Sequence, residues 1–132
     1  MQRTEDRMRE AEAELLTARD LLACGLWSRR YFNCWQAAGK ALKAVGGYFR
    51  QNSVGQNLGL LIRDLRAFVA TPEGFHQACV RLNRYHIPAL YPTAFDRVAP
   101  FDQFFEQGAR EAVQDAELVS ELARSVIAAP RV

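Results

Sequence analysis

Apolar residues recur at steps of three and four along most of the chain, and this spacing constrains the fold more than any other feature. The clearest run predicts a helix with a buried stripe formed by Tyr31, Cys34, Trp35, Ala38, Leu42 and Val45. The pair Gly46 and Gly47 is expected to weaken the end of this helix. Nowhere does an alternation of apolar and polar residues last long enough to predict a sheet. We therefore expect an all-α protein.

Five amphipathic segments follow one another along the chain with short connections between them. We expect them at about residues 5–24, 28–45, 57–69, 72–86 and 100–126. Helices joined by short connections pack as antiparallel neighbours. The sequence therefore predicts an antiparallel up-down helical bundle of four main helices plus one shorter helix, in a single domain over residues 1–132.

Local signals indicate where the predicted helices begin and end. Thr4 and Thr71 are expected to be N-caps, and Pro72 fits the first position of the fourth helix. Pro88 is expected to end that helix near residues 85–86, because its ring clashes with the carbonyl four residues earlier and it has no amide hydrogen. The chain is then expected to form an ordered connection until Pro100 starts the last helix.

The overall charge limits the kinds of partner that the chain can hold. Its formal net charge is +2 over 132 residues, which is too small to bind a polyanion through the overall field alone. Any nucleic-acid binding would therefore have to come from a local basic stripe. A hydrophobic share of 49% with 24% charged residues is typical of a globular domain and excludes a disordered chain.

Several features predict a cytoplasmic protein without a metal or cofactor. No stretch approaches the roughly 20 apolar residues that span a bilayer, and the N-terminus lacks the apolar core of a signal peptide. Cys24, Cys34 and Cys79 each lie in an apolar helical pattern, which favours reduced core thiols over disulfides. Only His76 and Cys79 have a helical ligand spacing, too few ligands for a zinc site.

Motifs of covalent catalysis are also missing, since the chain has no glycine-rich phosphate loop and no G-x-S-x-G turn. Two acidic clusters are expected to follow solvated helix faces and to have no catalytic role; they are formed by Glu10, Glu12 and Glu14, and by Asp115, Glu117 and Glu121. Chemistry based on a pair of carboxylates is therefore not expected.

A polar stripe on the second predicted helix is the best candidate for a binding surface, and it consists of Arg29, Asn33, Gln36, Lys40 and Lys43. Such a stripe could contact phosphates, or it could be a solvated face or a polar seam at a dimer contact. Tyr31, Phe32 and Trp35 could likewise stack on a base, although aromatic residues at helical spacing belong more often to a core.

Three segments, in order, resemble the HEPN family of nucleotide- and RNA-associated domains. The sequence YFNCWQAAGKALKA at residues 31–44 is similar to the family's aromatic helix with Q-A-A-E-K-A-L-K-A. Residues 55–61 are similar to the entry of its third helix, and residues 85–92, YHIPALYP, are similar to its Y-x-I-P-x-R-Y-P-D segment. The chain departs from the family at three usual polar positions, where it has Gly39, Gln56 and Leu90, and at Thr93 in place of Asp.

The resemblance implies a function in nucleotide or RNA transactions. The resemblance implies that catalytic members of the family are ribonucleases in which four to six residues separate an arginine from the following histidine, with two such motifs paired across a homodimer. Arg81 and His86 fit this spacing: a histidine can move the 2′-hydroxyl proton and an arginine can hold the scissile phosphate. On an unbroken helix these two residues point about 140° apart, so the helix end at Pro88 would be needed to bring them together.

Two hypotheses follow for the activity. In the first, the chain is a metal-independent, toxin-like endoribonuclease that uses Arg81 and His86 and is paired with a small nucleotidyltransferase, as the resemblance implies. Arg84 and the stripe residues Gln36, Lys40 and Lys43 would then bind phosphates of the nucleotide or RNA. In the second, the missing polar residues leave a non-catalytic homodimeric module for nucleotide binding or protein interaction. Arg81 would then be a helix-terminal arginine and His86 a surface histidine.

Overall fold

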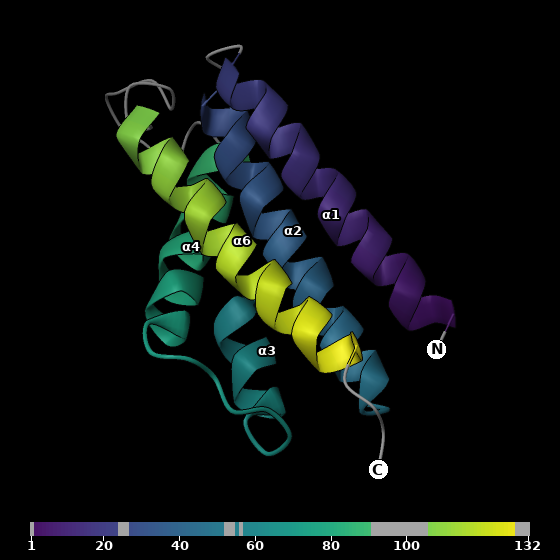
Figure 1. Cartoon of the computed structure of the whole chain (residues 1–132). Coiled ribbons are helices and arrows are strands. Elements are labelled where there is room, and N and C mark those ends of the chain that lie inside the picture. The colour runs from purple at the N-terminus through teal and green to yellow at the C-terminus, as the bar shows by residue number, and fades with distance from the viewer. Residues whose placement is uncertain (1, 24–26, 52–54, 56, 91–105, 129–132) are drawn as a thin grey trace.

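The computed structural model describes residues 2–23, 27–51, 55, 57–90 and 106–128, and this part of the chain is helical with no strand (Figure 1). The helices are α1 (Gln2–Ala23), α2 (Trp27–Tyr48), α3 (Leu58–Leu65), α4 (Phe75–Leu90) and α6 (Glu106–Ala128). The predicted all-α fold with four longer helices and one shorter helix is confirmed. None of the described helices is long and apolar enough to cross a membrane.

Helix α2 lies at the centre of the bundle, because α1, α3, α4 and α6 all pack against it. Figure 1 shows α1 beside α2 in the opposite direction, with α6 along the other side of α2. The predicted stripe from Tyr31 to Val45 is buried, and so are the small residues Ala37, Ala41 and Ala44 between its members. These alanines let neighbouring helices approach α2 on more than one side. The part of α2 that remains partly exposed is therefore a narrow ridge.

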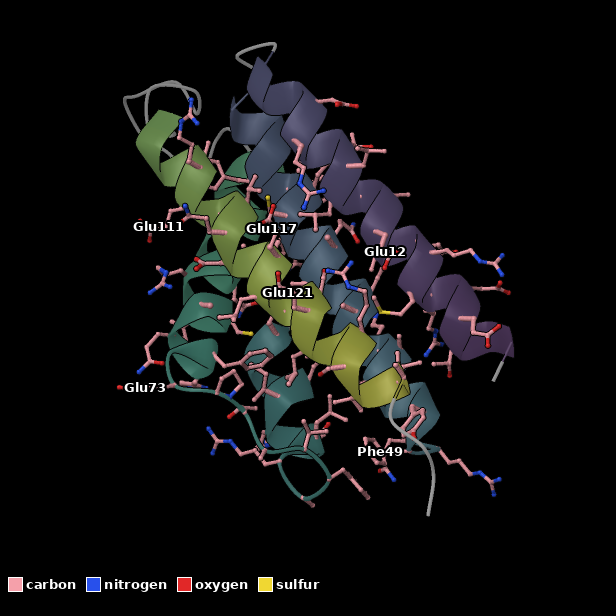
Figure 2. All side chains as sticks on the ribbon, viewed as in Figure 1. Glu12, Phe49, Glu73, Glu111, Glu117 and Glu121 are labelled. Atoms are coloured by element: carbon pink, nitrogen blue, oxygen red, sulfur yellow. The ribbon has the colours of Figure 1, made fainter. Side chains whose placement is uncertain are left out.

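Ion pairs tie α1 to α6 at two levels. The guanidinium of Arg19 donates two hydrogen bonds to Glu117 Oε1, at 3.0 Å from Nε and 2.8 Å from Nη2. Arg124 Nη1 donates to Oε1 of Glu12, which projects from α1 in Figure 2, at 3.1 Å. These pairs are exposed, so each stabilises the bundle by no more than about 1 kcal/mol. They align the two helices without burying charge.

The helix ends near the α1–α2 contact differ from the expectation. Thr4 does not cap α1, because the helix already includes Gln2, and Thr4 is buried at 3% exposure inside it. Gly46 and Gly47, which were expected to weaken the end of α2, lie within the helix, and it continues to Tyr48. A Cβ at Gly47 would lie 2.9 Å from Thr4 Oγ1. The glycine therefore allows a close helix contact whose packing outweighs the low helix propensity of this residue type.

Helix α3 is shorter than predicted, because it ends at Leu65 instead of continuing to residue 69. Its predicted inner residues Leu58, Leu61, Ile62 and Leu65 are buried, but Phe68 lies beyond the helix and is 44% exposed. Asn57 is the N-cap, and its Oδ1 accepts hydrogen bonds from the amides of Gly59 and Leu60 and from Asn83 Nδ2. The side chain of Asn83 accepts in turn from the Leu58 amide, which fixes α3 on α4.

Helix α4 differs from the prediction at both ends. It begins at Phe75, not at Pro72, because Gly74 has a left-handed φ of 84° that interrupts the helix after the Thr71-Pro72 signal. It continues through Pro88 to Leu90, so the predicted end near residues 85–86 is wrong. A proline close to the end of a helix removes a single amide donor, and the residues around it can keep helical dihedral angles. The expected start of the last helix at Pro100 lies outside the described residues.

Candidate functional site

The predicted polar stripe of α2 forms a partly buried seam against α1. Asn33 is buried at 6% exposure, whereas Gln36, Lys40 and Lys43 are half-buried. The side chain of Arg29 lies outside the described residues. The stripe therefore offers a narrow line of polar groups between two helices.

Lys40 is neutralised by α1 within this seam. Its Nζ lies 3.1 Å from Glu14 Oε1 and 3.9 Å from Glu10 Oε2. The side chains of Lys40 and Glu14 are 26% and 27% exposed, so this pair is more shielded from solvent than an ordinary surface pair. An incoming phosphate would have to compete with Glu14 for the Lys40 ammonium.

Lys43 lies one turn further along the seam and has no acidic partner among the described side chains. It is Arg7 that reaches this position from α1, since its Nη1 donates a hydrogen bond to the Lys43 carbonyl oxygen at 3.3 Å. Burial lowers the pKa of Lys43, and the positive charges of Arg7 and Lys40 lower it further. The end of the seam is therefore a cationic site. Lys43 was predicted from the sequence as part of a binding surface, but Arg7 was not.

Arg81, the predicted catalytic arginine, is held by two carboxylates of α6. Its Nε and Nη2 donate to the two oxygens of Asp115 at 2.9 and 2.8 Å, and Nε also lies 3.1 Å from Glu111 Oε1. Glu111 projects from the edge of α6 away from α1 (Figure 2). The Arg81 side chain is 37% exposed but that of Asp115 only 8%, so the pair is buried on one side. A bidentate pair of this kind is among the stronger interactions of an arginine.

The expectation that Asp115 lies on a solvated face is therefore wrong. Asp115 stands three residues after Ala112 and four before Val119, and both of these residues are buried. This spacing places Asp115 on the apolar stripe of α6, which is the sequence signal that could have indicated its burial. A buried carboxylate needs a cationic partner, and Arg81 supplies it.

His86 and Arg84 lie on α4, and their side chains are outside the described residues. Because α4 is helical through Leu90, the helix end that was expected to bring Arg81 and His86 together is not present. Residues five apart on an α-helix are rotated by about 140° about its axis. Within one chain, positions 81 and 86 therefore lie on different sides of α4.

The aromatic residues of α2 belong to the core. Tyr31 and Trp35 are 2% and 5% exposed, and the half-buried Phe32 packs on Trp35 with ring centroids 5.7 Å apart. Their interpretation as core residues is confirmed. A different aromatic pair reaches the surface: Phe49 stacks on Phe68 at 5.1 Å, at the end of α2 that also carries the C-terminal end of α6 (Figure 2). This surface pair was not predicted, because Phe68 was expected to face inward and the two residues meet only through tertiary contact.

The described cysteines are core thiols, as expected. Cys34 and Cys79 are buried thiols that form no disulfide with each other, whereas Cys24 lies outside the described residues. Burial, and to a smaller extent the nearby charge of Asp115, raises the pKa of Cys79 to about 12. Cys79 is therefore a protonated packing residue at neutral pH and not a nucleophile. No group of three or more His, Cys, Asp or Glu residues within the described ranges could hold a metal ion.

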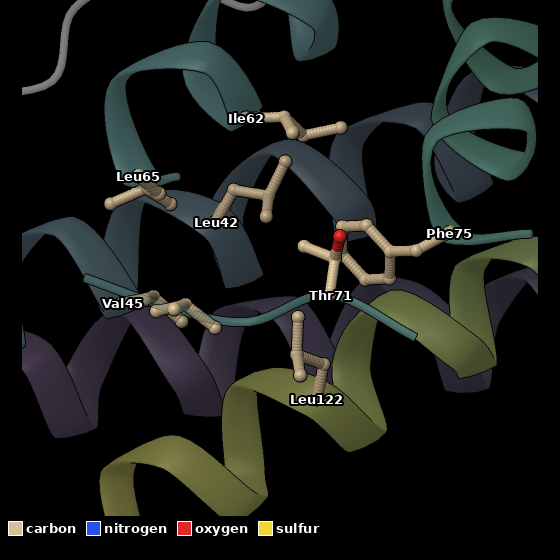
Figure 3. Close-up of a pocket in the computed structure, with 8 residues that line it drawn as sticks. Leu42, Val45, Ile62, Leu65, Thr71, Phe75 and Leu122 are labelled. Atoms are coloured by element: carbon tan, nitrogen blue, oxygen red, sulfur yellow. The ribbon is translucent and has the colours of Figure 1, made fainter. Parts of the chain in front are cut away.

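A small apolar cavity lies between α2, α3 and α6 (Figure 3). Its volume is about 10 Å³, and its walls are Leu42, Val45, Ile62, Leu65, Val69, Thr71, Phe75 and Leu122. That is space for about one water molecule and not for a nucleotide. The charged surface is therefore the more suitable place for a ligand.

Comparison with known proteins identifies relatives of the whole chain. The model of the HEPN domain family matches residues 4–126. The crystal structure of TT1696 from Thermus thermophilus superposes with a TM-score of 0.91 at 28% identity, covering 96% of this chain and 99% of that one. ST0689, an archaeal HEPN homologue, gives 0.80 at 24% identity, covering 96% and 99%. A HEPN domain protein from Thermotoga maritima gives 0.78 at 21% identity, covering 95% and 99%. No curated protein matches the chain.

Proposed function

The chain belongs to the HEPN domain family, and from this premise we propose that it is a non-catalytic cytoplasmic module that binds nucleotides or RNA as a homodimer. The family supports a function with nucleotides or RNA in general. We favour binding over cleavage because Arg81, the arginine that fits the spacing of the catalytic motif, is already paired with a carboxylate.

The salt bridge between Arg81 and Asp115 is the observation that carries this proposal. A catalytic arginine must offer its guanidinium edge to the scissile phosphate while negative charge develops on it. In this chain Asp115 occupies that edge with two hydrogen bonds of 2.9 and 2.8 Å. Releasing Arg81 would leave the largely buried Asp115 carboxylate without its partner, which costs about 2–3 kcal/mol. This cost opposes the use of Arg81 in catalysis.

The absence of family polar residues agrees with a binding function. Gly39, Gln56 and Leu90 stand where the family usually has Glu, His and Arg. Gly39 is buried within α2, so this position has no side chain where the family usually has a carboxylate. The apolar frame of the fold is retained although these polar groups are lost.

Binding and cleavage can be separated with one set of proteins. We expect the purified protein to shift the anisotropy of a labelled single-stranded RNA and to leave the RNA intact in the presence of a chelator. The oligomeric state should be measured on the same sample by light scattering, with a dimer expected. A protein that binds neither RNA nor nucleotides under low-salt conditions would contradict the proposal.

A metal-independent endoribonuclease is the second candidate, because Arg81 is still 37% exposed and shares α4 with His86. A second copy of the chain could bring its own histidine to this arginine, so the divergence of the two residues within one chain does not prevent such a site. In this case, RNA cleavage in chelator should be lost in His86→Ala and in Arg81→Ala.

The matched control for the nuclease is His76→Ala, since His76 is an exposed histidine at the start of the same helix. Cleavage that is lost in His86→Ala and kept in His76→Ala would favour the nuclease over the binding module. Cleavage that survives both Arg81→Ala and His86→Ala would rule out this assignment. A small nucleotidyltransferase encoded next to this gene, and isolated together with the protein, would support a two-component system.

A further inference from the structure

Along the seam between α1 and α2, a lysine of α2 faces acidic residues of α1 at one level, and one helical turn further a second lysine faces an arginine. At Lys40 the facing residues of α1 are acidic, with Glu14 at 3.1 Å and Glu10 at 3.9 Å. At Lys43 the residue that reaches across from α1 is Arg7. Within the described ranges neither Arg7 nor Lys43 forms an ion pair with a carboxylate. A pattern that otherwise pairs opposite charges therefore leaves two cations together at this point.

The position of Arg7 is fixed by the backbone of α2. Its Nη1 donates to the Lys43 carbonyl oxygen at 3.3 Å, and a Cβ built on Gly47 would lie 4.0 Å from the same nitrogen. Gly47 also lies close to the buried Thr4, so α1 and α2 are in tight contact beside the guanidinium. A guanidinium has five N–H donors, and this contact uses one of them. Arg7 is only partly buried, so this contact leaves four N–H donors for a ligand.

Within the part of the chain that the structure describes, no carboxylate compensates the charge of Lys43. Burial lowers its pKa, followed by the charges of Arg7 and Lys40. A nearby carboxylate would act in the opposite direction, because it favours the ammonium form. An anion between Arg7 and Lys43 would remove the repulsion and offset the cost of burial.

We propose that Arg7 and Lys43 form a binding site for a phosphate group at the Thr4–Gly47 end of the α1–α2 seam. The site deepens the proposed function, since it gives the nucleotide or RNA ligand a point of attachment. A phosphate fits two adjacent cations better than a carboxylate does, because it carries more negative charge and has more acceptor oxygens. Lys40 lies beside the site but remains paired with Glu14. Its positive charge therefore acts on the phosphate from a distance and not through a direct contact.

The test compares three phosphate probes on the whole chain: inorganic phosphate, ATP and a short single-stranded RNA. Removing a hydrogen bond to a charged group typically costs enough to weaken binding about tenfold. We therefore expect Arg7→Gln and Lys43→Met each to weaken binding of these probes about tenfold. For RNA, each variant should also lower the slope of log K against log salt by about one.

Arg63→Gln is the matched control, because Arg63 is an exposed arginine of α3 that pairs only with its neighbour Asp64 among the described residues. It removes the same charge from a different place, and we expect it to change binding less than twofold. Thermal unfolding provides a second measurement. In phosphate-free buffer, Lys43→Met should unfold at or above the wild-type Tm, since it removes the repulsion and keeps an apolar stem.

The outcomes separate this site from the proposed function. RNA or ATP binding that is equal in Arg7→Gln, Lys43→Met and wild type would overturn the site and leave the binding function in place. Stabilisation by inorganic phosphate that depends on both residues, without RNA or ATP binding, would support the site and contradict the function. A loss of binding as large in Arg63→Gln would also overturn the site, because it would indicate a general charge effect.

Discussion

Replacing Arg81 by alanine is expected to unfold the bundle more easily, because it leaves the Asp115 carboxylate without its partner in a largely buried position. The two residues are joined by hydrogen bonds of 2.9 and 2.8 Å, and they connect α4 to α6. The Asp115 side chain is only 8% exposed, so water would only partly replace the lost guanidinium. The loss is therefore larger than for an exposed pair.

The exposure of the two side chains sets the size of the effect. Breaking a fully buried ion pair costs about 3–5 kcal/mol, whereas an exposed pair contributes about 0–1 kcal/mol. With Arg81 at 37% exposure and Asp115 at 8%, this pair lies between these limits. We expect Arg81→Ala to lower the free energy of unfolding by about 2–3 kcal/mol, which corresponds to a fall in Tm of roughly 8–12 °C for a domain of this size.

Replacing the acidic partner should destabilise the fold less than Arg81→Ala does, and this difference tests the reasoning. Asp115→Asn keeps the shape of the side chain and leaves Arg81 partly exposed beside Glu111. We expect it to cost about 1 kcal/mol. The double variant Arg81→Ala/Asp115→Ala should be less destabilised than the sum of its two single alanine variants, by about 1–2 kcal/mol, because one substitution already breaks the pair.

Urea denaturation at neutral pH, followed by circular dichroism, measures all four variants and the wild type under the same conditions. The reasoning is refuted if Arg81→Ala costs less than about 0.5 kcal/mol, which is the range of ordinary surface substitutions. Additive effects in the double-mutant cycle would refute it as well. The same measurement is a control for the nuclease assay, because a loss of activity in Arg81→Ala is informative only if the variant is folded at the assay temperature.

Three further predictions concern packing, titration and capping. Gly108→Ala should cost about 1–3 kcal/mol by thermal denaturation, because its Cβ would overlap the buried Tyr31 hydroxyl; Tyr31→Phe should recover part of this loss, and no recovery would contradict the contact. The pKa of the Cys79 thiol is raised from 9.0 to about 12, so above pH 9 the unfolded state loses this proton first and stability falls until about pH 12. Wild type should therefore lose up to about 1.4 kcal/mol per pH unit more than Cys79→Ala in this window, and equal pH profiles would exclude such burial. Asn57→Ala should cost about 1–2 kcal/mol in urea, because it removes the α3 N-cap and the partner of Asn83; a cost no greater than that of an exposed surface substitution would show that the cap is not needed.

The buried stripes of the helices could be predicted from sequence with good accuracy, as the cores of α2 and α3 show. Tyr31, Leu42 and Leu61 are buried where the three- and four-residue spacing placed them. The helix ends were predicted less well. Pro88 and Gly47 are both poor helix residues, yet α4 and α2 continue through them. Local propensities of about 1–3 kcal/mol are small compared with the packing of a whole helix, so tertiary contacts decided these boundaries.

At the candidate site, too, the sequence identified the residues but not the side chains that surround them. The sequence identified Lys43 and Arg81 as cations of interest, because their spacing and the family resemblance singled them out. It could not show that Arg81 faces Asp115, 34 residues away, or that Lys43 faces Arg7, 36 residues away. These contacts depend on how α6 and α1 pack against their neighbours.

What the sequence by itself determined is the helical class, the faces that are buried and the family, because helical periodicity and short motifs are local properties of the chain. The tertiary structure decided the charge state of the surface: it neutralised Arg81 and Lys40 and left Arg7 beside Lys43. The physical reason is that a helix's buried face follows from the order of its own residues, whereas an electrostatic partner comes from whichever helix packs next to it. Coulomb energies fall with distance and rise with burial, so only the packed bundle fixes them.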